Sequence, residues 1–250
     1  MSYINHKDFA GVFMKFGEYE HLKAFREEGL LYCNPITYFT EIEDQSLRGD
    51  NMEDITQMIY FKDGTVAIGP PNEEVPADAP QLPFKDFNLI SRHAAPFGNL
   101  FCMTAVNLLD KPMGEIFRIN ERMKEFGKHF LYIHDSSAFM QRLGQKLKES
   151  KLHFETGLVE YKDFNKYTGS KSVFQKHNDF AYQQEWRLFI RNNNTDHIKI
   201  TIGSLEDISV IGSSENIEHL IIKGAQKDQD TFINLANFKP ATKEELGISS

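Results

Sequence analysis

The segment Phe174-Gln-Lys-His-Asn-Asp-Phe-Ala-Tyr-Gln-Gln-Glu-Trp-Arg-Leu-Phe-Ile190 changes from polar to mainly apolar residues near its middle. We predict a polar loop that runs into a strand beginning at Gln183. Successive side chains of a strand point to opposite faces, so Gln183, Glu185 and Arg187 share one face. One face of an otherwise apolar strand therefore carries an amide, a carboxylate and a guanidinium.

This face has two interpretations. In the functional one, Glu185 is a carboxylate held at the edge of a cleft. In the structural one, Glu185 and Arg187 form an ion pair on a solvated face, which is common and contributes little to stability.

An N-terminal unit of strand, helix and strand precedes this segment. Residues 11–16 read as a short strand, and residues 18–28 place Tyr19, Leu22 and Phe25 on one face of a helix. Gly29 is a natural helix end, and residues 30–33 form a strand that stops at the turn signal Asn34-Pro35. The unit would present Lys15 on its first strand and the aromatic residues that follow Pro35.

The middle of the chain contains an unusual run of prolines. Residues 69–86 hold five of the nine prolines, so we expect a loop or insertion there. Before it, the Asp63-Gly64 dipeptide predicts a tight hairpin between two short strands. After it, we expect a strand over 99–106 and helices over 115–126 and 136–150.

Strands dominate the last third. We expect strands over 185–191 and 197–202, joined as a hairpin by Asn192-Asn-Asn-Thr-Asp196, and a closing helix over 227–237. Helices early and strands late indicate an α+β fold rather than a regular array of parallel units. We expect one domain over 1–250 with the proline-rich insertion at 69–86 and a frayed tail over 239–250.

Composition excludes several classes of protein. The net charge of −8 argues against a protein that coats nucleic acid through a global positive field. Two cysteines, Cys33 and Cys102, form neither a disulfide framework nor a usual metal-ligand pattern. The sequence shows neither a signal peptide nor a run of about 18 apolar residues, so we expect a cytoplasmic protein without a membrane partner.

The Gln183-x-Glu185 element resembles that of mono-ADP-ribosyltransferases. The early block, in which Lys15 precedes a helix and the stretch Leu31-Tyr-Cys-Asn-Pro-Ile-Thr-Tyr-Phe39, looks like the first strand, helix and second strand of that fold. Both blocks also look like uncharacterised bacterial and phage families with a late Gln-x-Glu-Trp-Arg strand. The resemblance covers residues 12–43 and 158–202, and it implies two small sheets around a cleft with helices on the N-terminal side.

The resemblance also implies an enzyme that transfers ADP-ribose from NAD, with no metal, to a macromolecular acceptor. Glu185 would grip the ribose 2′-hydroxyl and Gln183 would orient the acceptor. The cofactor-binding candidates are Lys15 and Lys176 for the pyrophosphate, and Tyr38 and Phe39 for the nicotinamide ring. Tyr38 and Phe39 also fit ordinary core aromatics, and the two lysines also fit solvated side chains.

Two classes of function therefore stay open. The first is an ADP-ribosyltransferase, such as a toxin or a phage–host conflict enzyme controlled by an antitoxin or another regulatory partner. The second is a non-catalytic binding or regulatory protein in which Glu185 and Arg187 are structural and the proline-rich segment docks a partner.

Overall fold

The computed structural model of the chain describes residues 11–42, 47, 49–67, 69, 74–76, 79–94, 97–107, 116–215, 217 and 221–223. Its architecture is α+β, as expected. The helices are α1 (Tyr19–Glu28), α2 (Ile36–Glu41), α3 (Ser136–Ser150) and the 3-10 helices η2 (Glu121–Phe126) and η3 (Asn178–Gln183). The strands are β1 (Gly11–Gly17), β2 (Leu30–Pro35), β3 (Ile55–Ala67), β4 (Gln81–Arg92), β5 (Gly98–Asn107), β6 (Ile116–Arg118), β7 (His129–Ile133), β8 (Phe154–Leu158), β9 (Glu160–Lys162), β10 (Gly169–Ser170), β11 (Gln175–His177), β12 (Glu185–Arg191), β13 (Ile198–Thr201), β14 (Ser209–Ser213) and β15 (Ile221–Lys223).

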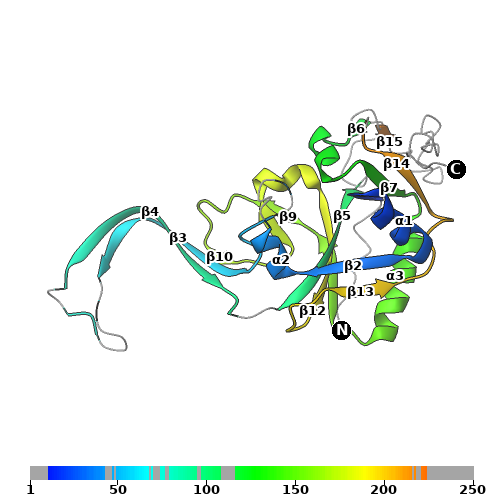
Figure 1. Cartoon of the computed structure of the whole chain (residues 1–250). Helices are drawn as coiled ribbons and strands as arrows, with labels where there is room; N and C mark the ends of the chain where they lie inside the picture. Colours follow the sequence, from blue (N-terminus) through cyan, green and yellow to red (C-terminus); the bar gives the residue numbers. More distant parts are fainter. Residues whose placement is uncertain are drawn as a thin grey trace, which may run out of the picture.

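The largest sheet is built around β5, and its strands follow the order β13-β2-β5-β1-β7-β14 (Figure 1). Strand β12 runs antiparallel to β5 over seven residue pairs along one edge, and β8 pairs with the outer edge of β12. The other edge of β5 is shared. Strand β1 pairs with residues 104–107 and β2 pairs with residues 99–100, so in the described part of the chain residues 101–103 lack a strand partner on that edge. The sheet therefore splits between β1 and β2.

The main core lies on the face of the sheet that α1 and α3 cover. Side chains from the sheet and from both helices meet there, among them Phe13, Trp186, Phe25 and Phe139. No described helix is long and apolar enough to cross a lipid bilayer.

The opposite face of the sheet carries two smaller apolar clusters with polar residues between them. Leu100 belongs to one cluster and Val106 to the other. Alternation along β5 puts Cys102 and Thr104 between these two residues, on the same face. Glu185 lies directly opposite Thr104 on β12, so the polar strip crosses both strands.

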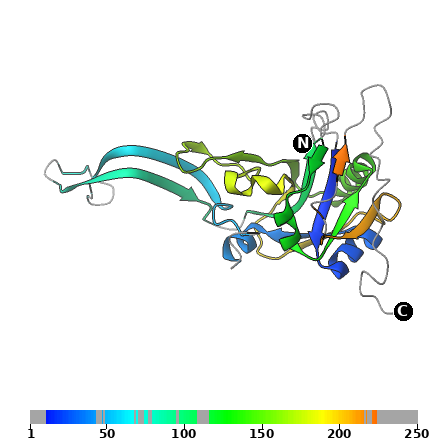
Figure 2. The same cartoon turned by 90° about the horizontal axis from the view of Figure 1, so that it is seen from above.

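Strands β3 and β4 form a long antiparallel hairpin that projects away from the rest of the molecule, as Figure 2 shows clearly. We call these two strands the arm. Asp63 and Gly64 lie inside β3 and pair with Lys85 and Phe84, so the tight hairpin expected at Asp63-Gly64 is wrong. Pairing of apolar residues on both sides of the dipeptide overrides its turn preference. The expected loop over 69–86 is also too long, because residues 81–86 belong to β4 and Pro83 pairs with Thr65.

Two further expectations are wrong. The helix expected over 115–126 is instead β6 followed by η2, with the Asn120 side chain accepting a hydrogen bond from the Arg122 amide at the start of η2. The hairpin expected between 185–191 and 197–202 does not form, because β13 pairs with β2. Asn99 of β5 donates to the Asp196 carbonyl and so ties the connection across the end of β5. The expected helix over 227–237 and tail over 239–250 lie outside the described residues.

Gly29 generates a testable prediction at the end of α1. Its φ is +67°, and a Cβ at this position would lie 2.1 Å from the Gly203 carbonyl oxygen. Gly203 is a matched control because its φ is +88° but a Cβ there would meet nothing within 4 Å. We expect Gly203→Ala to cost about 1–2 kcal/mol, the penalty of a left-handed conformation. Gly29→Ala should cost on the order of 3 kcal/mol or more, because a backbone clash is added.

Urea unfolding of the two variants measures this difference. Equal losses of unfolding free energy in the two variants would contradict the close approach of Gly29 to Gly203.

Candidate functional site

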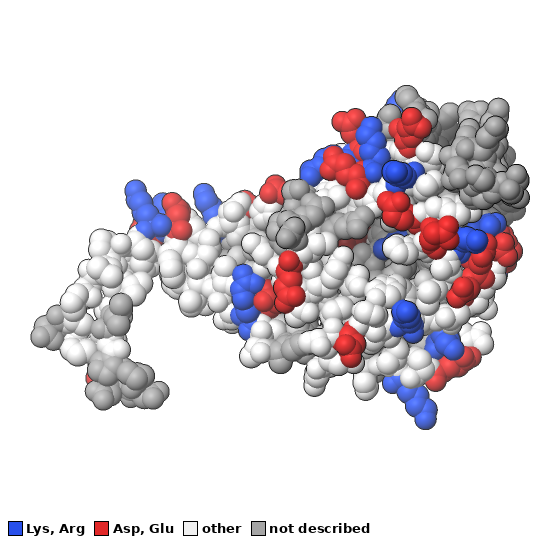
Figure 3. Space-filling model, viewed as in Figure 1, with Lys and Arg blue, Asp and Glu red and all other residues white. Residues whose placement is uncertain are grey.

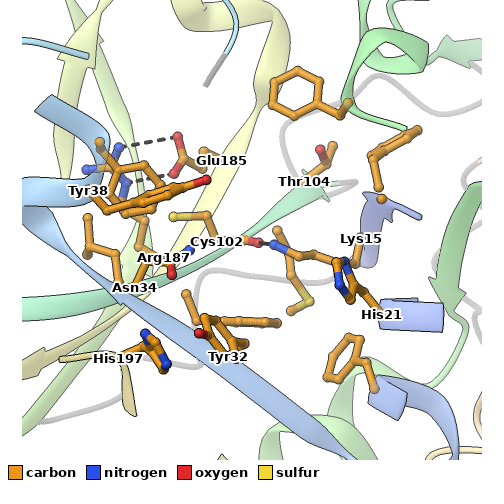
Figure 4. Close-up of a pocket in the computed structure, with 18 of the residues that line it drawn as sticks. Lys15, His21, Tyr32, Asn34, Tyr38, Cys102, Thr104, Glu185, Arg187 and His197 are labelled. Atoms are coloured by element: carbon orange, nitrogen blue, oxygen red, sulfur yellow. Dashed lines mark hydrogen bonds and ion pairs between the residues drawn. The ribbon is translucent and has the colours of Figure 1, made fainter. Parts of the chain in front are cut away.

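A cavity of about 1160 Å³ lies where the sheet splits. Residues of β1, α1, β2, α2, β5 and β12 line it, and Figure 4 shows several of their side chains turned toward it. The cavity is larger than the ~300–1,000 Å³ of most small-molecule sites. All six candidate catalytic and cofactor-binding residues line this one cavity: Lys15, Tyr38, Phe39, Lys176, Gln183 and Glu185.

An ion network around Arg187 forms one wall of the cavity. The guanidinium donates from Nε to Glu185 Oε1 at 2.8 Å and makes two hydrogen bonds with Glu53, at 2.9 and 2.5 Å. Arg187 is 1% exposed and Glu53 is 2% exposed. The interpretation of Glu185 and Arg187 as a pair on a solvated face is therefore wrong, because the pair is buried.

Lys176 connects the two residues of the Gln-x-Glu element. Its ammonium donates to Gln183 Oε1 at 2.9 Å and to Glu185 Oε2 at 3.4 Å. The amide nitrogen of Gln183 donates in turn to the Leu47 carbonyl at 2.8 Å. Both ends of the Gln183 amide are thus held by the protein itself.

Gln183 lies at the end of η3 rather than on the strand expected there. Gln184 has φ +45° and ψ +57°, a left-handed conformation that breaks the extended backbone before β12 begins at Glu185. The side chains of Gln183, Glu185 and Arg187 still converge, because the turn at Gln184 brings Gln183 back toward β12.

Electrostatics keep Glu185 ionised. Burial alone would raise its pKa, but the positive charges of Arg187 and Lys176 lower the pKa by more, well below that of an ordinary glutamate. Burial alone would also raise the pKa of Glu53, but the positive charges of Arg187 and Lys171 lower it by more. Glu185 is therefore a fixed negative charge rather than a general base.

The network continues into residues that sequence reasoning missed. Asp50, Glu53 and Lys171 are all buried, like Arg187. Burial, followed by the nearby charge of Glu53, raises the pKa of Asp50, and burial lowers the pKa of Lys171. Asp50 and Glu53 come before β3 and offer no strand or helix periodicity to read. Buried charges require partners, and this rule could have indicated Asp50 and Glu53. It can be applied only when the burial of a residue is known, which the sequence does not give.

Lys15 sits in the gap between β1 and β2. Its ammonium donates to the Cys102 carbonyl at 2.7 Å and lies 4.7 Å from the centre of the Phe101 ring. Both contacts involve the stretch of β5 without a strand partner on that edge. Lys15 thus satisfies a backbone acceptor that a continuous sheet would have paired with a strand.

Cys102 lies beside Glu185, and its surroundings disfavour a role as a nucleophile. Burial, followed by the charge of Glu185, raises the pKa of its thiol well above that of a free cysteine, so the reactive thiolate is disfavoured. Among the residues that the structure describes, no group of three His, Cys, Asp or Glu side chains is placed to hold a metal ion.

Tyr38 and Phe39 differ in exposure. Tyr38 is 39% exposed, whereas Phe39 packs against the cluster that contains Ile36 and Phe189. A second aromatic pair lines the cavity, in which the rings of Tyr32 and His197 are 4.5 Å apart. Exposed aromatic faces at a cavity wall suit a planar ring of a ligand.

Strand β12 offers a matched test of the ion network. Arg187 is buried between two carboxylates, whereas Arg191 on the same strand pairs with Glu155 at 3.5 Å with its side chain 69% exposed. Breaking a buried pair leaves an uncompensated charge, so we expect Arg187→Met to cost about 3–5 kcal/mol of unfolding free energy. Arg191→Met should cost at most about 1 kcal/mol. Urea unfolding checks both, and similar losses would refute a buried network.

The pKa of Glu53 predicts how stability responds to acid. A carboxyl whose pKa is lower in the folded state contributes stability above its unfolded pKa of about 4.3, and this stability is lost as the pH falls through the folded pKa. Unfolding free energy should therefore fall below about pH 4.3. Glu53→Gln removes this contribution and should flatten that decline, whereas Glu155→Gln should not. Urea titrations between about pH 3 and 7 test the sign.

Comparison of this chain with protein-family models, with curated proteins and with solved structures finds no match. Relatives therefore supply neither a substrate nor a role for any residue. The chemistry has to be argued from the cavity, its fixed carboxylate and its aromatic walls.

Proposed function

We propose that the cavity binds NAD and that the protein transfers ADP-ribose from NAD to a macromolecular acceptor. The observation that carries this proposal is the convergence of Lys15, Tyr38 and Glu185 on one cavity, with Glu185 ionised in its wall. These residues come from β1, α2 and β12, which lie far apart in sequence. The split of the sheet at β5 is compatible with the two small sheets around a cleft that the resemblance to mono-ADP-ribosyltransferases implies.

The reaction breaks the glycosidic bond between ribose C1′ and the nicotinamide nitrogen. The electron pair leaves with nicotinamide, and C1′ gains positive charge in the transition state. A heteroatom of the acceptor then bonds to C1′ and releases its proton to water. A fixed carboxylate that accepts a hydrogen bond from the 2′-hydroxyl stabilises this cation, and it does so more strongly in a cavity that excludes water.

The other side chains fit distinct parts of the dinucleotide. The exposed ring of Tyr38 would stack on nicotinamide, while Phe39 would support Tyr38 from the apolar cluster beside it. Lys15 would place positive charge near the pyrophosphate. Lys176 and Gln183 would act mainly by orienting Glu185, because their polar atoms already bind one another and Lys176 also binds Glu185.

One observation favours the alternative, a non-catalytic binding or regulatory protein. The Glu185 carboxylate already accepts hydrogen bonds from Arg187 Nε, Arg187 Nη2 and Lys176. A carboxylate has about four acceptor positions, so most of them are occupied. In this alternative the network serves only to join residues 50–53 to β12.

Turnover of NAD separates the two functions. We expect Glu185→Gln to lower turnover by about 10²–10³-fold with little change in NAD binding, because the lost charge acts at the transition state. Burial of the ion network means that this variant also loses stability, so the comparison is made at equal folded concentration. Tyr38→Ala, at an exposed position, should raise KM for NAD without unfolding the protein. Tyr60→Ala on the arm is its control.

The measurement is mass spectrometry of NAD, nicotinamide and labelled macromolecules after incubation with a whole-cell lysate. Release of nicotinamide with a labelled acceptor supports transfer. Absence of turnover by the wild type in lysates of several cell types, or equal turnover by wild type and Glu185→Gln, would instead leave the binding protein as the function.

A further inference from the structure

The arm exposes an unusual amount of apolar surface. Ten large apolar side chains are exposed in the described part of the chain, and six of them belong to β3 and β4. These six form what we call the apolar surface of the arm: Phe61, Val66, Leu82, Phe87, Leu89 and Ile90. Soluble monomers rarely concentrate exposed apolar side chains in this way, and such patches mark interaction sites.

Cross-strand pairing organises part of this surface. Phe61 lies opposite Phe87, and Ile59 lies opposite Leu89, so these four side chains share one face of the ribbon. The Phe84 ring adds to the group, at 5.1 Å from Phe87 and 6.0 Å from Phe61. A contiguous aromatic and aliphatic patch therefore covers the middle of the arm.

The body of the protein leaves this patch uncovered. Within the described residues, the outer edge of β3 pairs with another strand only where Gly169 and Ser170 of β10 meet Gln57 and Met58, near the base of the arm. Figure 1 and Figure 2 show the rest of the arm extending away from the body in two perpendicular views. A two-stranded hairpin alone is marginally stable in water, so a structure of this length calls for a partner surface.

The charges of the arm nearly balance, with Lys62, Lys85 and Arg92 against Asp63 and Asp86. Asp63 lies opposite Lys85, and Arg92 at the base pairs with Asp54. The Tyr60 hydroxyl donates to Asp86 at 2.5 Å. Figure 3 shows basic and acidic side chains close together along one side of the arm, as well as on the body. A formal charge of only +1 along the two strands does not suit the phosphate backbone of a nucleic acid, which requires several positive charges.

We propose that the apolar surface of the arm packs against the arm of a second copy of this chain. Each chain carries a net charge of −8, whereas the two strands of the arm together carry a formal charge of +1, so the repulsion between two copies comes from outside these strands. The arm is roughly 40 Å long at about 3.3 Å per residue, several times the screening length of about 8 Å at physiological salt. Contact through the arms therefore joins two copies while their charged bodies stay apart.

The apolar surface of the arm, counted over both faces of the ribbon, is large enough for such a dimer. A large side chain has about 150–250 Å² of surface, and each of the six is between 39% and 58% exposed, which gives roughly 500 Å² per arm. Two arms together would bury about 1,000 Å², which reaches the size of a specific interface. Ribbons of two strands twist strongly, so two arms can coil around each other and cover side chains on both faces.

Sedimentation velocity of the full-length chain between about 1 and 100 µM tests the proposal. We expect a reversible dimer whose dissociation constant falls as salt is added, because the bodies are screened while the apolar contact persists. Leu89→Lys, at a side chain that is 49% exposed, should raise the dissociation constant at least about tenfold. Phe87→Lys is a second, independent variant within the same patch.

Gln81→Lys is the matched control, because it adds the same charge to the arm at an exposed polar position outside the patch. It should leave the dissociation constant within about threefold of the wild type. A wild type that stays monomeric up to about 100 µM overturns the proposal, and flotation of that monomer with neutral phosphatidylcholine vesicles would then assign the patch to a lipid surface. Dimers of Leu89→Lys and Phe87→Lys as tight as the wild type would also overturn it.

Discussion

The buried guanidinium of Arg187 is the interaction on which the site depends. It is held by Glu185 two residues away on the same strand and by Glu53, which is 134 residues away in sequence. Desolvating an arginine is costly, and the cost is met only when both carboxylates are present and well placed. The packing of residues 50–53 against β12, the ionisation of Glu185 and the shape of one cavity wall all follow from this requirement.

The cavity exists because β1 and β2 share one edge of β5, and neither strand pairs with it along its whole length. Strand β1 takes one half of the edge and β2 takes the other, and Lys15 satisfies the Cys102 carbonyl left between them. A polar side chain at this point stabilises an opening that would otherwise expose an unpaired backbone acceptor. The proposed NAD site therefore rests on a defect in sheet pairing rather than on loops added to a complete sheet.

The sequence predicted secondary structure well where the residues that determine an element lie within that element. The N-terminal unit through Gly29, the strand β5, the capped helix α3 and the strand at Glu185 were all predicted with nearly correct boundaries. The Asp63-Gly64 dipeptide misled because its turn preference is a local quantity, whereas the pairing of β3 with β4 involves more than ten residue pairs. The pairing partners of strands could not be read from the sequence either. Residues 192–196 look like a hairpin turn, yet hydrogen bonds to Asn99 hold this connection across the end of β5. Among the residues that line the cavity, the sequence singled out those of the N-terminal unit and those between Lys176 and Arg187. It did not single out Glu53, because nothing local says that a carboxylate will be buried opposite a distant arginine.

The balance of charge in the buried network has a consequence for how this protein can change over generations. The buried group contains three acidic residues, Asp50, Glu53 and Glu185, and three basic residues, Lys171, Lys176 and Arg187, so their formal charges sum to zero. A substitution that alters one of these charges leaves a surplus in a region that excludes water, whereas a second substitution of opposite sign removes the surplus. Homologous chains should therefore keep or lose these residues in oppositely charged pairs, and single losses should be rare even where the exposed surface varies freely.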